Sequence, residues 1–143
     1  MYEAYFGLQK RPFSAQPSTD QYFPARAIEA ARQNHLRCVQ RGEGAGMVVG
    51  PTGCGKTLLC NLLADHFRGQ YRVATLLRGG LSTRRALLQA ILYELSQPYR
   101  GMDEGELRLA LSDYVTLSDE CPQGMLLIVD EAHALPIRLL DEI

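Results

Sequence analysis

Hydrophobic residues recur along most of the chain at two alternating spacings, one typical of amphipathic helices and one of short buried strands. In residues 25–41 the apolar positions fall at helical spacing, and Gly42 ends the pattern. Residues 45–49 form a short apolar run that leads directly into Gly50 and predicts a buried strand. Helical spacing returns in residues 59–67, so the order strand, glycine-rich loop, helix is predicted around Gly50.

The second half of the chain repeats this alternation. Residues 71–77 predict another strand. Two helices are predicted after it, one capped by Ser82 or Thr83 and one beginning at Asp103, which forms a capping-box pattern with Glu106. Both helices carry their leucines on one face, so we expect both to pack against the sheet.

A last apolar run, residues 125–129, is bounded by turn signals and ends in Asp130 and Glu131. It predicts a third buried strand, which would deliver two carboxylates to the edge of the sheet where ligands bind. Strands that alternate with helices in this way predict an α/β fold, with a parallel sheet flanked by helices.

The N-terminal segment has a different composition. Residues 1–24 hold six of the eleven aromatic residues and three of the seven prolines. We therefore predict an extended aromatic arm over residues 1–24, which packs on an apolar surface, and a sheet-containing domain over residues 25–143.

Charge and composition narrow the function classes. The formal net charge of -1 gives no electrostatic case for nucleic acid or for an anionic membrane. No run approaches the roughly 18–20 apolar residues of a membrane-spanning helix, and the N-terminus lacks the pattern of a signal peptide. The four cysteines include no C-x-x-C pair. This indicates free thiols in a reducing compartment, and we expect a cytoplasmic protein.

The strongest chemical signal is a complete match to the P-loop, or Walker A, pattern G-x-x-x-x-G-K-[ST]. Its residues are Gly50, Pro51, Thr52, Gly53, Cys54, Gly55, Lys56 and Thr57. The glycines let backbone N–H groups turn toward a phosphate at a helix N-terminus. Lys56 can reach the β- and γ-phosphates of ATP, and the Thr57 hydroxyl can hold Mg²⁺. The alternative is a glycine-rich turn with a solvated lysine, which the predicted strand and helix on either side disfavour.

Asp130 and Glu131 give the second signal, which is typical of a Walker B motif. At the end of a buried strand, Asp130 would bind Mg²⁺ through water, opposite Thr57. Glu131 would orient and polarise the attacking water, a role worth about 10²–10⁴ in rate. Two exposed acids at a strand end are the alternative, and the preceding P-loop disfavours it.

Two further side chains near these motifs have less specific interpretations. Cys54 would be reactive if the helix N-terminus lowers the pKa of its thiol. The simpler interpretation, which we prefer, is that Cys54 is a small residue that fits between the glycines of the loop. His133 would either sense the γ-phosphate or, as we expect, pack against or cap the helix predicted after Glu131.

Taken together, these features resemble a known family. The matching segments are Tyr5-Phe6-Gly7-Leu8, Arg11-Pro12-Phe13, Tyr22-Phe23, the P-loop, and Val129-Asp130-Glu131-Ala132-His133-Ala134. They resemble the ATPase domain of general secretion pathway protein A, the ExeA type of AAA+ ATPase, which has relatives in pilus biogenesis and transposition. The resemblance covers the whole chain, and its specificity lies in the F-G-L…P-F opening.

The resemblance implies a P-loop NTPase of the AAA+ type that hydrolyses ATP with Mg²⁺ and releases ADP, with Lys56 and Glu131 as catalytic residues. It also implies that Phe13, Tyr22 or Phe23 lies near the adenine base. Self-association, an envelope-assembly partner, and a place at the inner face of the inner membrane are further implications.

Two features depart from the family pattern. Leu58 stands where these loops often have a hydroxyl residue, so only its backbone N–H remains for the α-phosphate. The chain ends at Ile143, inside an apolar helical pattern. This implies a domain truncated after the Walker B strand, with the family's sensor strand, arginine finger and lid lying beyond it.

Other function classes stay open. A DNA-associated ATPase of the transposition-helper type shares the same core, although the charge does not support nucleic acid. A DEAH-box helicase would explain the P-loop and residues 130–133, but it leaves the F-G-L…P-F arm unexplained. A small-molecule P-loop kinase would have no need of Glu131.

Overall fold

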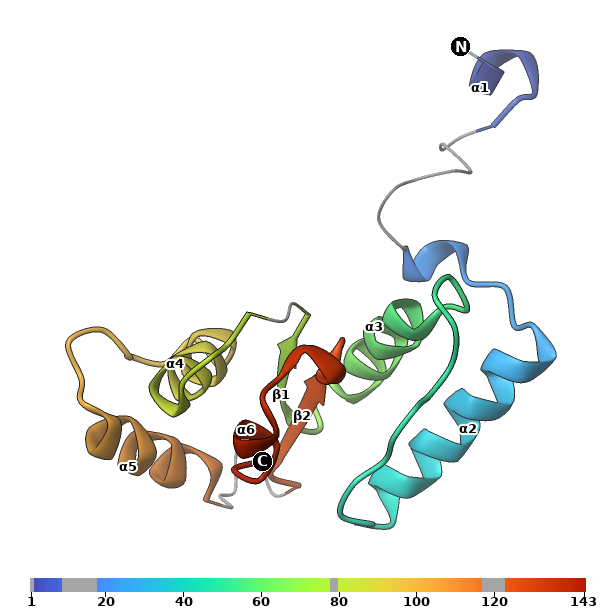
Figure 1. Cartoon of the computed structure of the whole chain (residues 1–143). Helices are drawn as coiled ribbons and strands as arrows, with labels where there is room; N and C mark the ends of the chain where they lie inside the picture. Colours follow the sequence, from blue (N-terminus) through green and yellow to red (C-terminus); the bar gives the residue numbers. More distant parts are fainter. Residues whose placement is uncertain (1, 9–17, 78–79, 117–122) are drawn as a thin grey trace.

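A computed structural model describes residues 2–8, 18–77, 80–116 and 123–143. Figure 1 shows helices on both sides of a small sheet. The elements are α1 (Tyr2–Tyr5), η1 (Thr19–Gln21), α2 (Arg26–Gln40), α3 (Lys56–Phe67), β1 (Arg72–Leu76), α4 (Arg84–Glu94), α5 (Glu104–Val115), β2 (Met125–Val129), η2 (Ala132–Ala134) and α6 (Ile137–Leu140). The predicted α/β class is confirmed.

The sheet consists of β1 and β2, which pair in parallel with Arg72 opposite Met125 and Leu76 opposite Val129. The ladder continues one step further, because the Asp130 N–H donates to the carbonyl of Leu76 at 2.8 Å. This bond fixes the direction in which the chain leaves the sheet just before Glu131.

Successive side chains of the two strands point to opposite faces, and each face has its own hydrophobic core. On one face Leu126 and Ile128 pack with α2 and α3, around the fully buried Phe67. On the other face Leu127 and Val129 pack with α4, α5 and α6. Apolar side chains therefore alternate along β2 between two cores, as expected for a parallel strand covered on both sides.

The helix starts follow the predicted capping chemistry. Thr83, rather than Ser82, caps α4, and its side chain accepts from the Ala86 N–H. Asp103 and Glu106 form the complete capping box of α5, with each side chain bonded to the other's backbone N–H. Both caps satisfy N–H groups that a helix leaves unpaired in its first turn.

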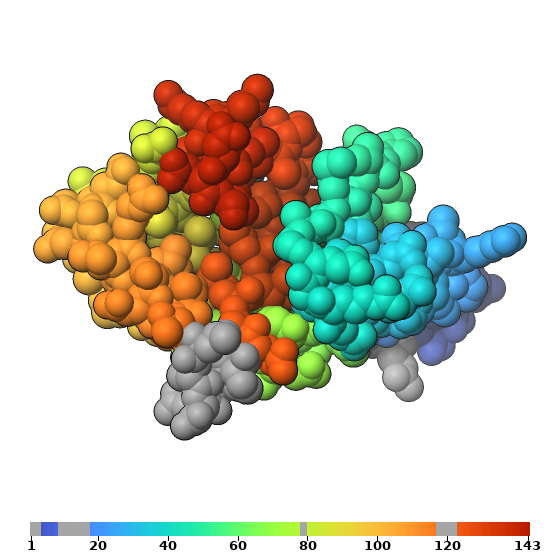
Figure 2. All heavy atoms as spheres, turned by 90° about the horizontal axis from the view of Figure 1, so that it is seen from below, coloured from blue at the N-terminus to red at the C-terminus, as the bar shows by residue number. Residues whose placement is uncertain are grey.

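The predicted strand over residues 45–49 is wrong. This segment has no regular secondary structure, and Met47 and Val49 are 83% and 81% exposed rather than buried. Figure 2 shows the stretch between α2 (blue to cyan) and α3 (green) at the surface of the molecule. The physical reason is the lack of a partner: in the described part of the chain β2 pairs only with β1, and no strand lies beside residues 45–49.

The described residues of the arm are partly helical rather than extended throughout, and whether the arm packs on an apolar surface stays a prediction. Tyr2–Tyr5 forms a helical turn, and Tyr5, Phe6 and Phe23 are exposed. The arm is fixed instead by polar contacts at its end, where the Thr19 hydroxyl donates to Asp65 at 3.0 Å. Phe13 lies outside the described residues.

A second polar cluster joins the arm to α2. The Tyr22 hydroxyl donates to Glu29 at 2.6 Å, and Arg32 donates to both carboxylate oxygens of Glu29. The bonds from Arg32, with those from Gln33 and Tyr22, lower the pKa of Glu29 to about 2. The Glu29 carboxylate therefore stays ionised and holds the start of α2 and the end of the arm together.

Past β2 the chain turns instead of entering a long helix. The short η2 is followed by Pro136 and by α6, whose Leu139 is fully buried in the second core. The helix predicted directly after Glu131 is therefore broken into two short pieces, because Pro136 cannot continue the first. No described helix is both long enough and apolar enough to cross a membrane.

Candidate functional site

The loop from Gly50 to Thr57 closes tightly before α3, and its glycines are required by its geometry. Gly53 and Gly55 have φ values of 82° and 91°, in the left-handed region that side chains disfavour. A Cβ on Gly50 would lie 2.8 Å from the Cys54 sulfur, and one on Gly55 would lie 2.9 Å from Cδ1 of Ile28. The loop therefore has the glycine-dependent turn before a helix N-terminus that suits an anion.

Lys56 is folded over this loop. Its Nζ donates to the carbonyl oxygens of Gly50 and Pro51, at 3.0 and 2.9 Å. Both acceptors are neutral, so an anionic phosphate oxygen would be a stronger partner for the same ammonium group.

Thr57 and Asp130 lie side by side, although 73 positions separate them in the sequence. The Thr57 hydroxyl donates to Oδ2 of Asp130 at 2.6 Å. The Asp130 side chain is also fixed from its other oxygen, because Oδ1 accepts from the Glu131 N–H at 3.0 Å. Asp130 is only 6% exposed, so both bonds hold a buried carboxylate at the start of α3.

The pair of Thr57 and Asp130 suits Mg²⁺ better than a metal ion whose ligands all come from protein side chains. The residues that the structure describes contain no group of three or more His, Cys, Asp or Glu side chains arranged to hold a metal ion. Mg²⁺ usually keeps several waters and is bound by one or two carboxylates together with substrate phosphates. A hydroxyl and one buried carboxylate beside a phosphate loop are the ligands such a site needs.

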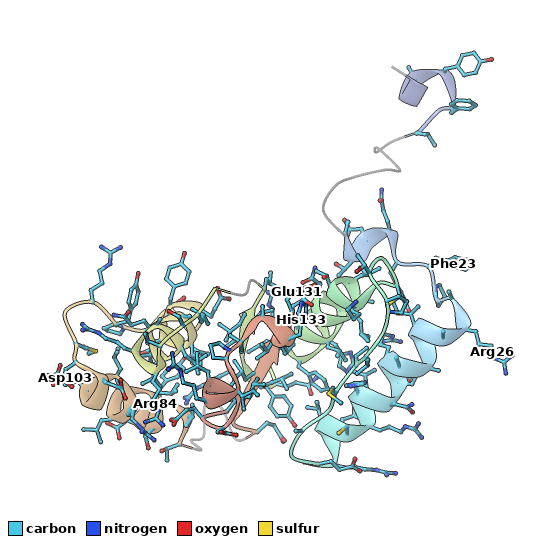
Figure 3. All side chains as sticks on the ribbon, in the orientation of Figure 1. Phe23, Arg26, Arg84, Asp103, Glu131 and His133 are labelled. Carbon is cyan, nitrogen blue, oxygen red and sulfur yellow. The ribbon has the colours of Figure 1, made fainter. Side chains whose placement is uncertain are left out.

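Glu131 has an unusual backbone. With φ 54° and ψ 37° it occupies the left-handed region, which a residue without special constraints seldom adopts. It forms the N-cap of η2, and its carbonyl accepts from the Ala134 N–H at 2.8 Å. The turn therefore directs the Glu131 side chain away from the axis of β2, into a half-exposed position (Figure 3).

His133 neither packs in a core nor caps a helix, so the interpretation that we expected for it is wrong. Its side chain is 78% exposed, and Nε2 lies 3.3 Å from Oε2 of Glu131. Figure 3 shows the two labelled residues next to each other, at the turn that follows β2. The sequence could not predict this contact, because residues two apart match no helical spacing and the contact depends on the left-handed turn at Glu131.

Two of the three aromatic residues expected near adenine, Tyr22 and Phe23, lie in the described part of the chain, between η1 and α2. Phe23 is 79% exposed and lies beside the start of α2, next to Arg26 in Figure 3. The hydroxyl of Tyr22 is bonded to Glu29. A cleft of about 500 Å³ near η1 is lined by Asp65, Arg68 and Glu94 among others, and by no residue of the loop. The position of the adenine base therefore stays a prediction.

Cys60 of α3 lies in an electrostatically unfavourable place for a thiolate. Burial, and then the negative charge of Asp130, raise the pKa of the Cys60 thiol to about 11. Cys54, in the loop, is exposed. Because the thiolate is the reactive form, the two thiols should differ in reactivity.

We expect iodoacetamide at pH 8 to modify Cys60 at least about tenfold more slowly than Cys54. The Cys60 rate should rise with pH up to its pKa of about 11, since the thiolate fraction increases with each unit of pH below that value. Mass spectrometry of the alkylated peptides measures both rates. Equal labelling of Cys54 and Cys60 at pH 8 would contradict the burial of Cys60 beside Asp130.

Comparisons with known proteins found similar sequences. The family described as AAA domain matches residues 39–143 of the chain. General secretion pathway protein A of Aeromonas hydrophila is 31% identical over 140 residues, which make up 95% of this chain and 25% of that protein. The chain therefore spans a quarter of the length of this curated relative. The search of solved structures found no match.

Proposed function

Because the chain belongs to the AAA-domain family, we propose that it binds ATP with Mg²⁺ at residues 50–58 and forms part of an ATP-hydrolysing module. The observation that carries the proposal is the bond of 2.6 Å between Thr57 and Asp130. It brings together a hydroxyl at the start of α3 and a carboxylate at the end of β2, beside a loop of phosphate-binding pattern.

Each residue has a defined part in this proposal. The N–H groups from Thr52 to Leu58 face the phosphates, and Lys56 exchanges its two carbonyl partners for β- and γ-phosphate oxygens. Thr57 and Asp130 hold Mg²⁺, which when bound neutralises charge on the phosphates. Glu131 accepts a hydrogen bond from the attacking water and polarises it.

Replacing Asp130 with Asn tests the metal part of the site. The amide keeps the shape of the side chain but loses the charge, so we expect the Mg²⁺-dependent gain in ATP affinity to fall by about tenfold or more. Calorimetric titrations with ATP in Mg²⁺ and in EDTA measure this gain. Asp141→Asn, at an exposed position, is the matched control. An unchanged Mg²⁺ dependence in Asp130→Asn would mean that Asp130 does not act on the metal.

The relative's name gives the proposal a cellular role. We infer that a protein carrying this chain couples ATP hydrolysis to a general secretion pathway, as the name of the Aeromonas hydrophila protein suggests. Self-association and an envelope-assembly partner belong to the same inference. A DNA-associated role receives no comparable support, because the formal net charge is -1.

A further inference from the structure

We propose that His133 is a positioning residue for Glu131, holding one carboxylate oxygen so that the other is presented to the attacking water. The proposal rests on the proposed function, because it assigns a role within the same site. Its basis is the distance of 3.3 Å between Nε2 of His133 and Oε2 of Glu131.

The backbone on both sides of the Glu131 side chain is already fixed. The Glu131 N–H donates to Oδ1 of Asp130 at 3.0 Å, and the Glu131 carbonyl accepts from Ala134 at 2.8 Å. Its φ of 54° sets the direction of the Cα–Cβ bond. What remains free is rotation of the side chain, which is 48% exposed and so receives little restraint from packing.

His133 is placed to limit that rotation and has little other structural role. Its ring is more exposed than the carboxylate it contacts, at 78% against 48%, and it belongs to neither hydrophobic core. Removing the ring therefore exposes little apolar surface and should leave the fold intact. A side chain of this kind is explained by its contact with Glu131 rather than by packing.

The chemistry of the contact favours a one-sided restraint. In the imidazole tautomer with a proton on Nε2, the positive end of the N–H dipole lies near Oε2 of Glu131, since Nε2 and Oε2 are 3.3 Å apart. The second carboxylate oxygen, Oε1, then keeps its lone pairs for a proton of the water that attacks the phosphate. A carboxylate that rotates freely would present this oxygen in the right direction for a smaller fraction of the time.

Kinetics of the ATP-hydrolysing protein give the first test. We expect His133→Ala to lower kcat by about 3–10-fold while KM for ATP stays the same. A loss of this size is at or below the low end of the effects typical of residues that orient a ligand or a base. His133→Gln, whose amide nitrogen can reach a similar place, should restore most of the loss. His66→Ala, at an exposed histidine of α3, is the matched control.

Three kinetic outcomes would overturn the proposal while leaving ATP hydrolysis established. They are a parental kcat in His133→Ala, a loss of the same size in His133→Gln, and a change confined to KM. If instead the parent does not bind ATP and Glu131→Gln changes nothing, the proposed function fails, and the positioning role in hydrolysis fails with it.

Nitrogen NMR of the His133 ring tests the contact in this chain without turnover. Relative to a histidine in a short unstructured peptide, the parent should show a larger excess of the Nε2–H tautomer, and Glu131→Ala should move both ring nitrogen resonances toward the peptide values. Ring resonances that are the same in the parent and in Glu131→Ala would show that His133 does not hold Glu131, and would overturn the proposal whatever the kinetics.

Discussion

Replacing Glu131 with Gln should lower ATP turnover by about 10²–10⁴-fold while ATP remains bound. The amide keeps the size of the side chain and a hydrogen-bonding oxygen, but it loses the basic oxygen that polarises water. The partly buried Thr57–Asp130 pair and the loop are untouched, so nucleotide affinity should stay near that of the parent. Phosphate release and nucleotide titration, measured on the same ATP-hydrolysing preparation, separate the two effects.

Glu104→Gln provides the control for the loss of a negative charge, because Glu104 is exposed in the first turn of α5. It should leave both quantities unchanged. Hydrolysis by Glu131→Gln at the parental rate would make Glu131 a bystander and would remove the reason for a positioning role at His133.

Replacing Lys56 with Ala should weaken the binding of ATP and ADP by about 10–100-fold, the range expected for loss of a hydrogen bond to a charged group. Among the described residues, the ammonium group bonds to the carbonyl oxygens of Gly50 and Pro51, so these are the bonds it gives up for phosphate. Calorimetry at low salt measures the affinities directly.

The sequence provides a matched control for Lys56→Ala. It contains only two lysines, Lys10 and Lys56, so Lys10→Ala makes the same chemical change outside the loop. The two variants have the same net charge, and only Lys56→Ala should lose affinity. Equal affinities for the parent and Lys56→Ala would be incompatible with a phosphate site at this loop.

Elements with strong local signals could be predicted from the sequence. The strand over Met125–Val129 is the apolar run itself, bounded by turn residues, and the capping box of Asp103 and Glu106 is a contact between residues three apart. Both depend on neighbours in the sequence, which is why a pattern can reveal them.

For residues 45–49, neighbours in the sequence do not decide whether a strand forms. An apolar run indicates that a segment suits a strand, but the segment becomes one only if a second strand pairs with its N–H and C=O groups. In the described part of the chain, β2 has β1 on one side and no strand on the other. Met47 and Val49 are therefore exposed, although their side chains are apolar and suit a buried strand.

The residues of the candidate site also divide into those that a sequence motif predicts and those that it does not. The loop and the pair of acids follow from a motif, and Thr57 and Asp130 meet at 2.6 Å because α3 packs beside β2 in the first hydrophobic core. The left-handed turn at Glu131 and its contact with His133 do not follow from any spacing, because a single backbone angle decides them. The position of adenine among Phe13, Tyr22 and Phe23 stays a prediction, because it depends on the path of the whole arm, and Phe13 lies outside the described residues.

Hydrogen exchange of this chain with and without ADP and Mg²⁺ tests most directly whether the loop before α3 is the nucleotide site. A nucleotide bound there should slow exchange in residues 52–58, whose N–H groups would face the phosphates, and at Glu131, next to the metal-binding carboxylate. Exchange in α5, on the far side of the sheet from α3, should not change. Protection confined to other segments, or no protection at saturating nucleotide, would contradict an ATP·Mg²⁺ site at this loop.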